Sequence, residues 1–379
     1  MHFLPSKEEE ARLYQTVHEI IKKINIPGAT AKLGGSGAKN TWLAGTHDID
    51  IYIVYNYESF KNKSEQLADL TEKHLKKHFK LTRLHGSRDY YQTKHNNYTI
   101  EFIPILNITK ANEAKNITDV SQLHVNYVLK NKKYSEDIRK AKAFTKAAEV
   151  YGAESYIQGF SGYLVELLVI NYKGFNNFIK NVAQWKQITT IGKKEDINNL
   201  NEAKKQSPLI FIDPVDNTRN AAAALNKEKY EQLIKTCKNY LKTKNKEKYF
   251  EQPTFHLPEI KKYYNTLFTI NVEKGKTDVV GAALRKKEEK MNYALRQHDF
   301  IIQKHGWHWD QKTNKAYFYY QLKETLLPTI KEQPGPPITM KEAVQHFKKK
   351  HKKTVIKKGK IYAIEKRKIR TPQDLQAYF

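Results

Sequence analysis

Cysteine is nearly absent from this chain, which has one, Cys237, among 379 residues. A single thiol excludes an intramolecular disulfide and any zinc site built on several cysteines. Long apolar runs are missing too, since the longest, "GYLVELLVI" from Gly162 to Ile170, is far too short to cross a bilayer. Met1 to Lys7 also lacks the hydrophobic core of a signal peptide. We therefore expect a cytoplasmic protein with no membrane partner.

Acidic residues are scarce relative to basic ones, with 40 Asp and Glu against 67 Lys and Arg and a formal net charge of +27. Such an excess raises the local concentration of polyanions and favours nucleic acid as a partner over an anionic surface. A lysine-rich composition can also arise from codon bias, so part of this charge need not serve a function.

The C-terminal portion combines charge with aromatic residues. Residues 348–370 hold ten lysines and two arginines against one acid, Glu365. A solvated charged surface is the simplest interpretation of such a run. The preceding aromatic residues favour an RNA-contacting platform instead, because bases stack on aromatic rings while lysines meet phosphates. These aromatic residues are Trp307, Trp309, Tyr317, Phe318, Tyr319 and Tyr320.

A chain of this length, with 39% hydrophobic residues, is large enough for two or three domains. Near the N-terminus, Ser6 to Glu9 reads as a capping box before a helix, and Ser59 to Phe79 has the pattern of another amphipathic helix. Strands are expected around "SRDYYQTKH" and over "YTIEFIPIL", Tyr98 to Leu106.

Residues 120–240 read as mainly helical, and within them "LIFIDPVDNTRNAAAALNKEKYEQLIKTCKNYL", Leu209 to Leu241, predicts a short strand, a DPVD turn and a helix rich in alanine. The pattern then becomes mixed, with strands at "TLFTINVEK", "GWHWDQKTNKAYFYYQL" and "KIYAIEKRKI". We expect a helix over Val279 to His305 and a linker at "PTIKEQPGPPITM". No internal repeat is found.

The stretch "GGSGAKNTWLAGTHDIDIYIVY", residues 34–55, carries the strongest chemical signal. Gly34 and Gly35 allow a tight turn that brings backbone N–H groups near an anion. Ser36 through Leu43 can form a short helix whose N-terminal end favours the same anion, and Ser36 adds a hydroxyl.

The second half of this stretch places two carboxylates on one strand face. Asp48 and Asp50 alternate with isoleucines, and this period-two pattern predicts a strand with one buried face. Neighbouring carboxylates repel one another unless they hold a cation, and Mg²⁺ suits such oxygen donors together with substrate phosphates. Glu101 lies on the face of the expected 98–106 strand, so the three acids converge if the two strands are neighbours. A loop followed by an exposed strand end would explain either half alone, but their order and spacing favour a metal–nucleotide site.

These residues resemble the nucleotidyltransferase signature of archaeal-type (class I) CCA-adding tRNA nucleotidyltransferases. Further blocks are similar to this family, namely "YGAESYIQGFSGYLVELLVINYKGF" (Tyr151 to Phe175), "FIDPVDNTRNAAAAL" (Phe211 to Leu225) and the "GPP" of Gly335 to Pro337. The signature alone would indicate only the polymerase-β-like superfamily, whereas the second and third blocks point to this family.

The resemblance implies an α+β multidomain fold. A polymerase-β-like palm, or head, would span residues 1–115 and a helical neck 116–245, with an α/β body and a shortened tail over 246–379. It also implies template-independent addition of C, C and A to the tRNA 3′ end from CTP and ATP with two Mg²⁺ ions. The partners would be the 3′ end and acceptor stem of tRNA, and a homodimer is a candidate assembly.

The resemblance assigns roles to ten residues. Asp48, Asp50 and Glu101 would be the catalytic metal ligands. The nucleotide contacts would be Gly35, Ser36, Lys39, His124, Lys142, Tyr151 and Arg219. Lysines are suitable cations for a triphosphate, and a guanidinium can pair with a base edge.

Some of these residues also have simpler interpretations. Taken alone, His124 could start a helix, Lys142 could lie on the surface and Tyr151 could be a core aromatic. We expect Asp213 and Asp216 to be turn and helix-cap groups. The pairs His74 with His78 and His305 with His308 lack further ligands at zinc spacing, so no zinc site is predicted.

Two features depart from the family pattern. The third carboxylate is usually aspartate, and the extra methylene of Glu101 moves its oxygens by about one bond length. The tail that grips the tRNA elbow in this family is expected to be shortened, so smaller or hairpin RNAs are also candidate acceptors. A related RNA-tailing or oligoadenylate-forming enzyme with another acceptor is the alternative, and an inactive RNA-binding protein on the same scaffold is a third reading that intact Asp48 and Asp50 oppose.

Overall fold

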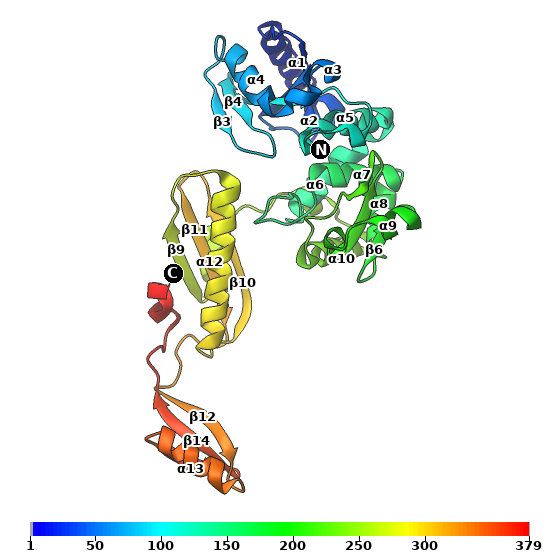
Figure 1. The fold of residues 1–379 in the computed structure, drawn as a ribbon. Coiled ribbons are helices and arrows are strands. Elements are labelled where there is room, and N and C mark those ends of the chain that lie inside the picture. Colours follow the sequence, from blue (N-terminus) through cyan, green and yellow to red (C-terminus); the bar gives the residue numbers. More distant parts are fainter. Residues whose placement is uncertain (1–2, 379) are drawn as a thin grey trace. The chain divides into compact units, whose positions relative to one another are not determined.

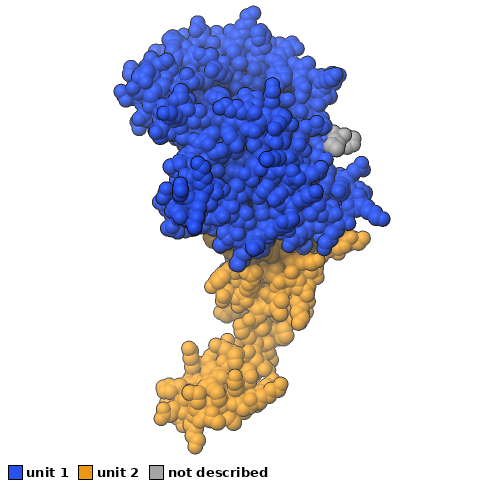
Figure 2. Space-filling model, turned by 90° about the vertical axis from the view of Figure 1, so that its right-hand side faces the viewer, with its two compact units in different colours: residues 1–253 blue, residues 254–379 orange. Residues whose placement is uncertain are grey.

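The computed structural model describes residues 3–378. It divides into two compact units, one up to Pro253 and one from Thr254 onward (Figure 2). No helix in the described residues is both long and apolar enough to cross a membrane.

The first unit contains a five-stranded sheet in the order β1-β2-β5-β4-β3, of which β3 and β4 are labelled in Figure 1. Its central strands β2 (Asp48–Tyr55) and β5 (Tyr98–Leu106) run parallel, and the other pairs are antiparallel. The remaining elements of this region are α1 (Lys7–Lys22), β1 (Ala29–Leu33), α2 (Gly35–Lys39), α3 (Tyr57–Phe60), the 3₁₀ helix η1 (Lys61–Gln66), α4 (Leu67–Leu75), β3 (Thr82–Leu84), β4 (Tyr90–His95), η2 (Ala111–Glu113) and η3 (Ile117–Val120).

The predicted helix start and strands in this region are confirmed. The Ser6 hydroxyl accepts the Glu9 backbone N–H at 3.2 Å, and the Glu9 carboxylate accepts the Ser6 N–H at 2.8 Å. Strand β5 covers the nine residues expected, and β2 begins at Asp48. The alternation in β2 holds only at its start, because beyond Ile51 the strand is buried on both faces. The acidic residues therefore lie at the open end of an otherwise enclosed strand.

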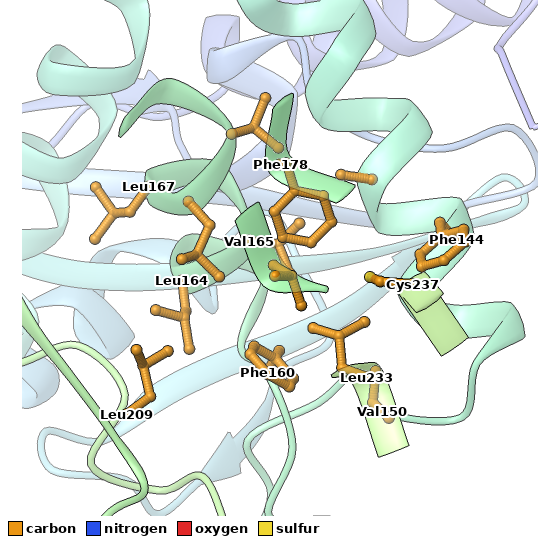
Figure 3. Close-up of a cluster of buried hydrophobic side chains, with 14 of the residues drawn as sticks. Phe144, Val150, Phe160, Leu164, Val165, Leu167, Phe178, Leu209, Leu233 and Cys237 are labelled. Carbon is orange, nitrogen blue, oxygen red and sulfur yellow. The ribbon is translucent and has the colours of Figure 1, made fainter. Parts of the chain in front are cut away.

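The rest of the first unit is mainly helical. It contains α5 (Ser121–Lys130), η4 (Lys132–Tyr134), α6 (Ser135–Ala147), α7 (Gly162–Asn171), α8 (Phe175–Val182), β6 (Thr189–Ile191), α9 (Lys194–Asn199), η5 (Glu202–Lys205), β7 (Leu209–Asp213), β8 (Asp216–Asn220), α10 (Lys227–Lys242) and η6 (Glu247–Phe250). Its core is separate from that of the five-stranded sheet and packs Phe144, Phe160, Val165 and Phe178 around α7 (Figure 3). Cys237 is fully buried in this core, and burial raises the pKa of its thiol, so it acts as a packing residue.

Three helix predictions in the first unit were wrong in their extent. The helix expected over Ser59 to Phe79 is broken into α3, η1 and α4, since the polar run 61–66 offers no apolar face and Lys63 leaves the helical region (φ −124°). The helix expected from Ser36 to Leu43 ends at Lys39, because Asn40 adopts a left-handed conformation (φ 53°). The helix expected after the DPVD turn is present as α10, but its start was misplaced: the alanines form a turn, and the helix begins only after Asn226, whose side chain caps it.

The second unit contains two three-stranded sheets. In the first, ordered β10-β11-β9, helix α12 packs across one face (Figure 1). In the second, ordered β12-β14-β13, the short helix α13 packs against β12. The elements are α11 (Leu257–Tyr263), β9 (Thr266–Asn271), α12 (Thr277–Gln297), β10 (Ile302–Asp310), β11 (Lys315–Leu322), β12 (Ile330–Pro337), α13 (Lys341–Lys350), β13 (Thr354–Lys357), β14 (Lys360–Lys366) and η7 (Pro372–Tyr378).

Two predictions in the second unit were wrong. The segment expected to be a linker contains β12, and its prolines are tolerated because β12 is an edge strand with a register shift between Pro334 and Pro337. The helix expected to reach His305 ends at Gln297. Asp299 then takes a positive φ of 68°, which turns the chain into β10.

Candidate active site

The glycine turn is packed directly against β2. The backbone N–H of Gly34 donates to the Asp50 carbonyl at 2.8 Å, and that of Gly35 donates to the Tyr52 hydroxyl at 3.1 Å. Gly35 has a φ of +52°, and a Cβ atom there would lie 1.6 Å from Asp50 Oδ2. Only glycine fits this position, because it tolerates this backbone conformation and leaves space for the carboxylate. The turn is thus bonded to the Asp50 backbone and leaves room for the Asp50 carboxylate.

The three predicted acids come together at the start of β2 and β5. The parallel register places Asp50 opposite Glu101 and Asp48 opposite Thr99. The Glu101 carboxylate accepts a hydrogen bond from the Gln92 side-chain amide at 2.8 Å, from the neighbouring strand β4. The expectation that the two acidic strands are neighbours is therefore confirmed.

Asp50 and Glu101 each lie close enough to another acid for its negative charge to raise their pKa values. Burial raises the pKa of Asp50 to about 6, and the negative charges of Glu101 and Asp48 act in the same direction. Burial and Asp48 also raise the pKa of Glu101, although its hydrogen bond from Gln92 partly offsets this. A divalent cation would reverse this trend by favouring the ionised form of each carboxylate.

The acids fit a magnesium site as part of its ligand shell. Within residues 3–378, no three histidine, cysteine or acidic side chains are grouped closely enough to hold a metal by themselves. Mg²⁺ commonly takes only one or two protein carboxylates and completes its shell with phosphates and water. The oxygen donors of Asp48, Asp50 and Glu101 match that chemistry, and a substrate would have to supply further ligands.

Next to the glycine turn, a buried carboxylate joins two of the predicted lysines. Glu166 on α7 is fully buried, and Lys39 and Lys142 each place their Nζ atom 2.7 Å from one of its oxygens. The Thr41 hydroxyl donates to the same carboxylate at 2.7 Å, and Lys142 also donates to the Thr41 carbonyl and hydroxyl oxygens. Burial would raise the pKa of Glu166, but the two lysines lower it to about 2. The carboxylate therefore stays ionised at neutral pH.

A second buried carboxylate, Asp213, contacts two of the predicted nucleotide contacts, Arg219 and His124. Arg219 Nη1 donates to Asp213 Oδ2 at 2.5 Å, the Tyr163 hydroxyl donates to Oδ1 at 3.0 Å, and the Val215 N–H donates to Oδ1 at 3.1 Å. His124 Nε2 lies 3.2 Å from Oδ2. Burial opposes ionisation of Asp213, but His124, the Val215 N–H and Arg219 together lower its pKa.

Tyr163 connects the two buried carboxylate clusters. Its ring stacks on His124 with centroids 4.0 Å apart. Lys39 Nζ lies 5.7 Å from the centroid of that ring, and the Arg219 guanidinium carbon lies 5.9 Å from it. The predicted phosphate contacts and the predicted base contact therefore share one aromatic side chain.

Tyr151 lies beside the Glu166 cluster. Burial raises its pKa to about 12, and the charge of Glu166 adds to this. Its hydroxyl is close enough to Gly162 that a Cβ there would lie 2.6 Å from it, and Lys146 Nζ is 5.2 Å from its ring centroid. Ser36 stands in the first turn of α2, beside Gly35.

Sequence reasoning missed Glu166, Tyr163 and the role of Asp213. Glu166 is the one acid within the apolar run from Gly162 to Ile170, and an acid in that setting is a signal for a buried, paired charge. Asp213 is indeed at a turn, as its bond with Val215 shows, but its main partners are Arg219 and Tyr163. Asp216 does not cap a helix: it begins β8 and accepts hydrogen bonds from Thr218.

In the second unit the predicted aromatic platform is divided between two faces of one sheet. Phe318 and Tyr320 are fully buried on the side covered by α12, and Trp307 and Trp309 pack against that same core. The alternation along β11 sends Tyr317 to the opposite face.

On that opposite face the aromatic rings form a stack. The Phe255 ring is parallel to His308, with centroids 4.1 Å apart and planes 5° apart, and it stacks on Tyr317 at 5.0 Å. Tyr319 meets Tyr264 edge-on at 4.7 Å. Flat, partly exposed rings of this kind suit base stacking.

Comparison with known proteins identifies the class of protein. Residues 136–251 match the family model "tRNA nucleotidyltransferase, second domain", and residues 261–377 match "CCA-adding enzyme, C-terminal domain". The helical part of the first unit therefore matches a tRNA nucleotidyltransferase domain, and nearly all of the second unit matches a domain of CCA-adding enzymes.

Relatives over the whole chain identify the family. A CCA-adding enzyme of Nanoarchaeum equitans is 34% identical over 96% of this chain and 91% of its own length. One of Methanosarcina barkeri is 30% identical over 92% of this chain and 79% of its own. The chain therefore belongs to the archaeal CCA-adding enzyme family. Among solved structures, CdnC of E. coli MS115-1 with ATP resembles it with a TM-score of 0.46 at 13% identity, covering 65% of this chain and 91% of CdnC.

Proposed function

We propose that this protein adds C, C and A to the 3′ end of tRNA without a template, transferring CMP and AMP from CTP and ATP and releasing pyrophosphate. Support comes from the family membership over almost the whole chain and from the convergence of Asp50 with Glu101 in the parallel register. The acceptor is the 3′ end and acceptor stem of tRNA.

In each addition the RNA 3′ oxygen bonds to the α-phosphorus and the bond to the departing pyrophosphate breaks. Asp48, Asp50 and Glu101 would hold two Mg²⁺ ions, which when bound would activate the hydroxyl and offset charge on the phosphates. Gly35 keeps Asp50 in place, and Gln92 orients Glu101. Preorganisation of this kind lowers the barrier because little rearrangement is needed at the moment of reaction.

The other residues of the site would bind and select the nucleotide. Lys39 and Lys142 would offset the negative charge of the triphosphate. Arg219 would read the base edge, with its guanidinium fixed by Asp213. Ser36, His124 and Tyr151 complete the proposed nucleotide contacts.

The second unit would bind the RNA. Its stacked rings around Phe255 suit unpaired bases, and the lysines of residues 348–370 suit phosphates. Cytoplasmic location and a homodimer remain predictions within this proposal.

The test is nucleotide addition on three tRNAs, ending at the discriminator base, at C and at CC, with Mg²⁺ and each of the four nucleotides singly and mixed. We expect addition of C, C and then A with no further extension. Long runs of one nucleotide would instead indicate an RNA-tailing enzyme. Tight RNA binding without incorporation would indicate an inactive binding protein.

A further inference from the structure

The cluster around Glu166 lies between the two functional parts of the site. The Lys39 charge is close enough to Asp50 to lower its pKa, against the effect of burial. The same ammonium group lies over the Tyr163 ring, whose hydroxyl binds Asp213 beside Arg219. Lys39 is thus near both the proposed α-phosphate site at Asp50 and, through Tyr163, the proposed base contact Arg219.

The charges of the cluster do not cancel. Two ammonium groups meet one carboxylate, and the remaining partners of Lys142 are the neutral carbonyl and hydroxyl oxygens of Thr41. A buried excess of positive charge is costly, and a triphosphate is a ligand that would relieve it.

We propose that Glu166 is a positioning residue for the nucleotide triphosphate: it holds Lys39 and Lys142 side by side so that their excess charge meets the phosphates. This inference rests on the proposed function and extends it to a residue to which sequence reasoning gave no role. Lys39 follows the glycine turn and Lys142 lies on α6, so Glu166 also ties together two segments about a hundred residues apart in the chain.

The competing interpretation is that Glu166 only holds these two segments together. Arg139 provides the matched control, because it is a buried residue of α6, as Lys142 is, and donates to the Trp42 carbonyl and the Asn40 side chain in the segment before β2 and to Glu10 of α1. Its partners do not include either lysine or Glu166. Arg139→Gln should therefore weaken the same junction without disturbing the cluster.

The first experiment measures equilibrium binding of CTP, ATP and CMP without RNA. In Glu166→Gln, CTP and ATP should each bind roughly 10- to 100-fold more weakly, by the same factor, because the two lysines are no longer held side by side, and this loss of positioning outweighs the added positive charge. CMP should lose much less, since it carries fewer phosphates. Arg139→Gln should bind all three as the unmodified protein does, at whatever cost in thermal stability.

The steady-state prediction is a rise in KM for CTP and ATP that exceeds the fall in kcat. If Glu166→Gln does not fold, Thr41→Val removes one hydroxyl from the same cluster and should raise both KM values by a smaller factor. Unchanged CTP binding, or equal losses for CTP and CMP, would overturn the inference even if CCA addition is observed. A selective loss of CTP binding in a protein that does not add CCA would leave it standing while the proposed function fails.

Discussion

The two units of this protein use charge in opposite ways. In the first unit the acids Asp119, Glu166 and Asp213 are almost fully buried, and each is bound by several donors. The second unit has ion pairs that are open to solvent, as in Lys357 with Glu332, whose side chains are 51% and 41% exposed. Glu288 is an exception, being buried beside His305.

The difference between buried and exposed charges matches the two proposed tasks, nucleotide transfer in the first unit and RNA binding in the second. Fixed, buried charges suit chemistry, because a desolvated group placed in advance acts strongly on a small substrate. Exposed lysines suit a large, hydrated polyanion that is bound through many weak, salt-sensitive contacts. The predictions below test this contrast, from the largest expected effect to the smallest.

The sharpest contrast is between a buried and an exposed ion pair. Asp119 accepts hydrogen bonds from Arg88 and from the backbone of Leu106, and Asp119→Ala should lower the free energy of unfolding by about 3 to 5 kcal/mol, because Arg88 is left buried without its partner. Glu332→Ala should cost less than about 1 kcal/mol. Urea unfolding of both variants measures this, and equal losses would remove the contrast.

Substitutions at two glycines test whether the glycine turn is needed to leave room for the Asp50 carboxylate. In Gly35→Ala, the new Cβ collides with the Asp50 carboxylate, so kcat/KM should fall roughly 100-fold or more. Gly45 is the matched control, because its φ of +71° is similar but no atom lies within 4 Å of a Cβ there. Gly45→Ala should cost about 1 kcal/mol of stability and leave activity near normal. Similar activity losses in both variants would attribute the effect to backbone strain alone.

Nucleotide selection should depend on Asp213. In Asp213→Asn, Arg219 loses its charged partner, and discrimination against UTP and GTP should fall roughly 10- to 100-fold. The ratio of kcat/KM values for the four nucleotides measures it. Asp216→Asn is the control, since that carboxylate is partly exposed and, among residues 3–378, accepts hydrogen bonds from Thr218 alone. Unchanged selectivity in Asp213→Asn would mean that Arg219 does not read the base in this arrangement.

The pH dependence of the free energy of unfolding should show the lowered pKa of Glu166. Its pKa is about 2 in the folded protein, against 4.5 as its ordinary value. The stability that its ionised form contributes is fully present above about pH 4.5 and is lost as the pH falls toward 2, by roughly 1.4 kcal/mol per pH unit. The difference in unfolding free energy between the unmodified protein and Glu166→Gln should therefore be constant near neutrality and shrink in acid. A difference that stays constant down to pH 3 would contradict the depressed pKa.

The smallest effect is expected in the second unit. Lys348, Lys349 and Lys350 are exposed at the end of α13. Replacing all three with glutamine should lower the slope of log affinity for tRNA against log salt by roughly 2 to 3, because fewer counterions are released. The KM for CTP and ATP should not change. An unaltered salt slope would exclude this helix from the RNA contact.

Sequence patterns predicted which acids lie on neighbouring strands better than they predicted the buried groups around them. Asp50 and Glu101 could be paired because both lie on clear strands with alternating residues. Glu166 and Asp213 could not be given their roles, because their partners lie far away in the sequence, on other elements. Strand β12 was missed because local proline content argues against a strand, whereas its position at a sheet edge removes the penalty. The domain boundaries near residues 115 and 245 and the short tail remain predictions.

The separation between nucleotide transfer and RNA binding is tested most directly by the variant Asp50→Asn, assayed both for tRNA binding and for nucleotide addition. With tRNA lacking its CCA end, tRNA binding should match that of the unmodified protein at the same salt concentration. Single-turnover addition of C from CTP should fall below detection. Retained addition, or loss of tRNA binding together with addition, would contradict the assignment of the two tasks to two regions.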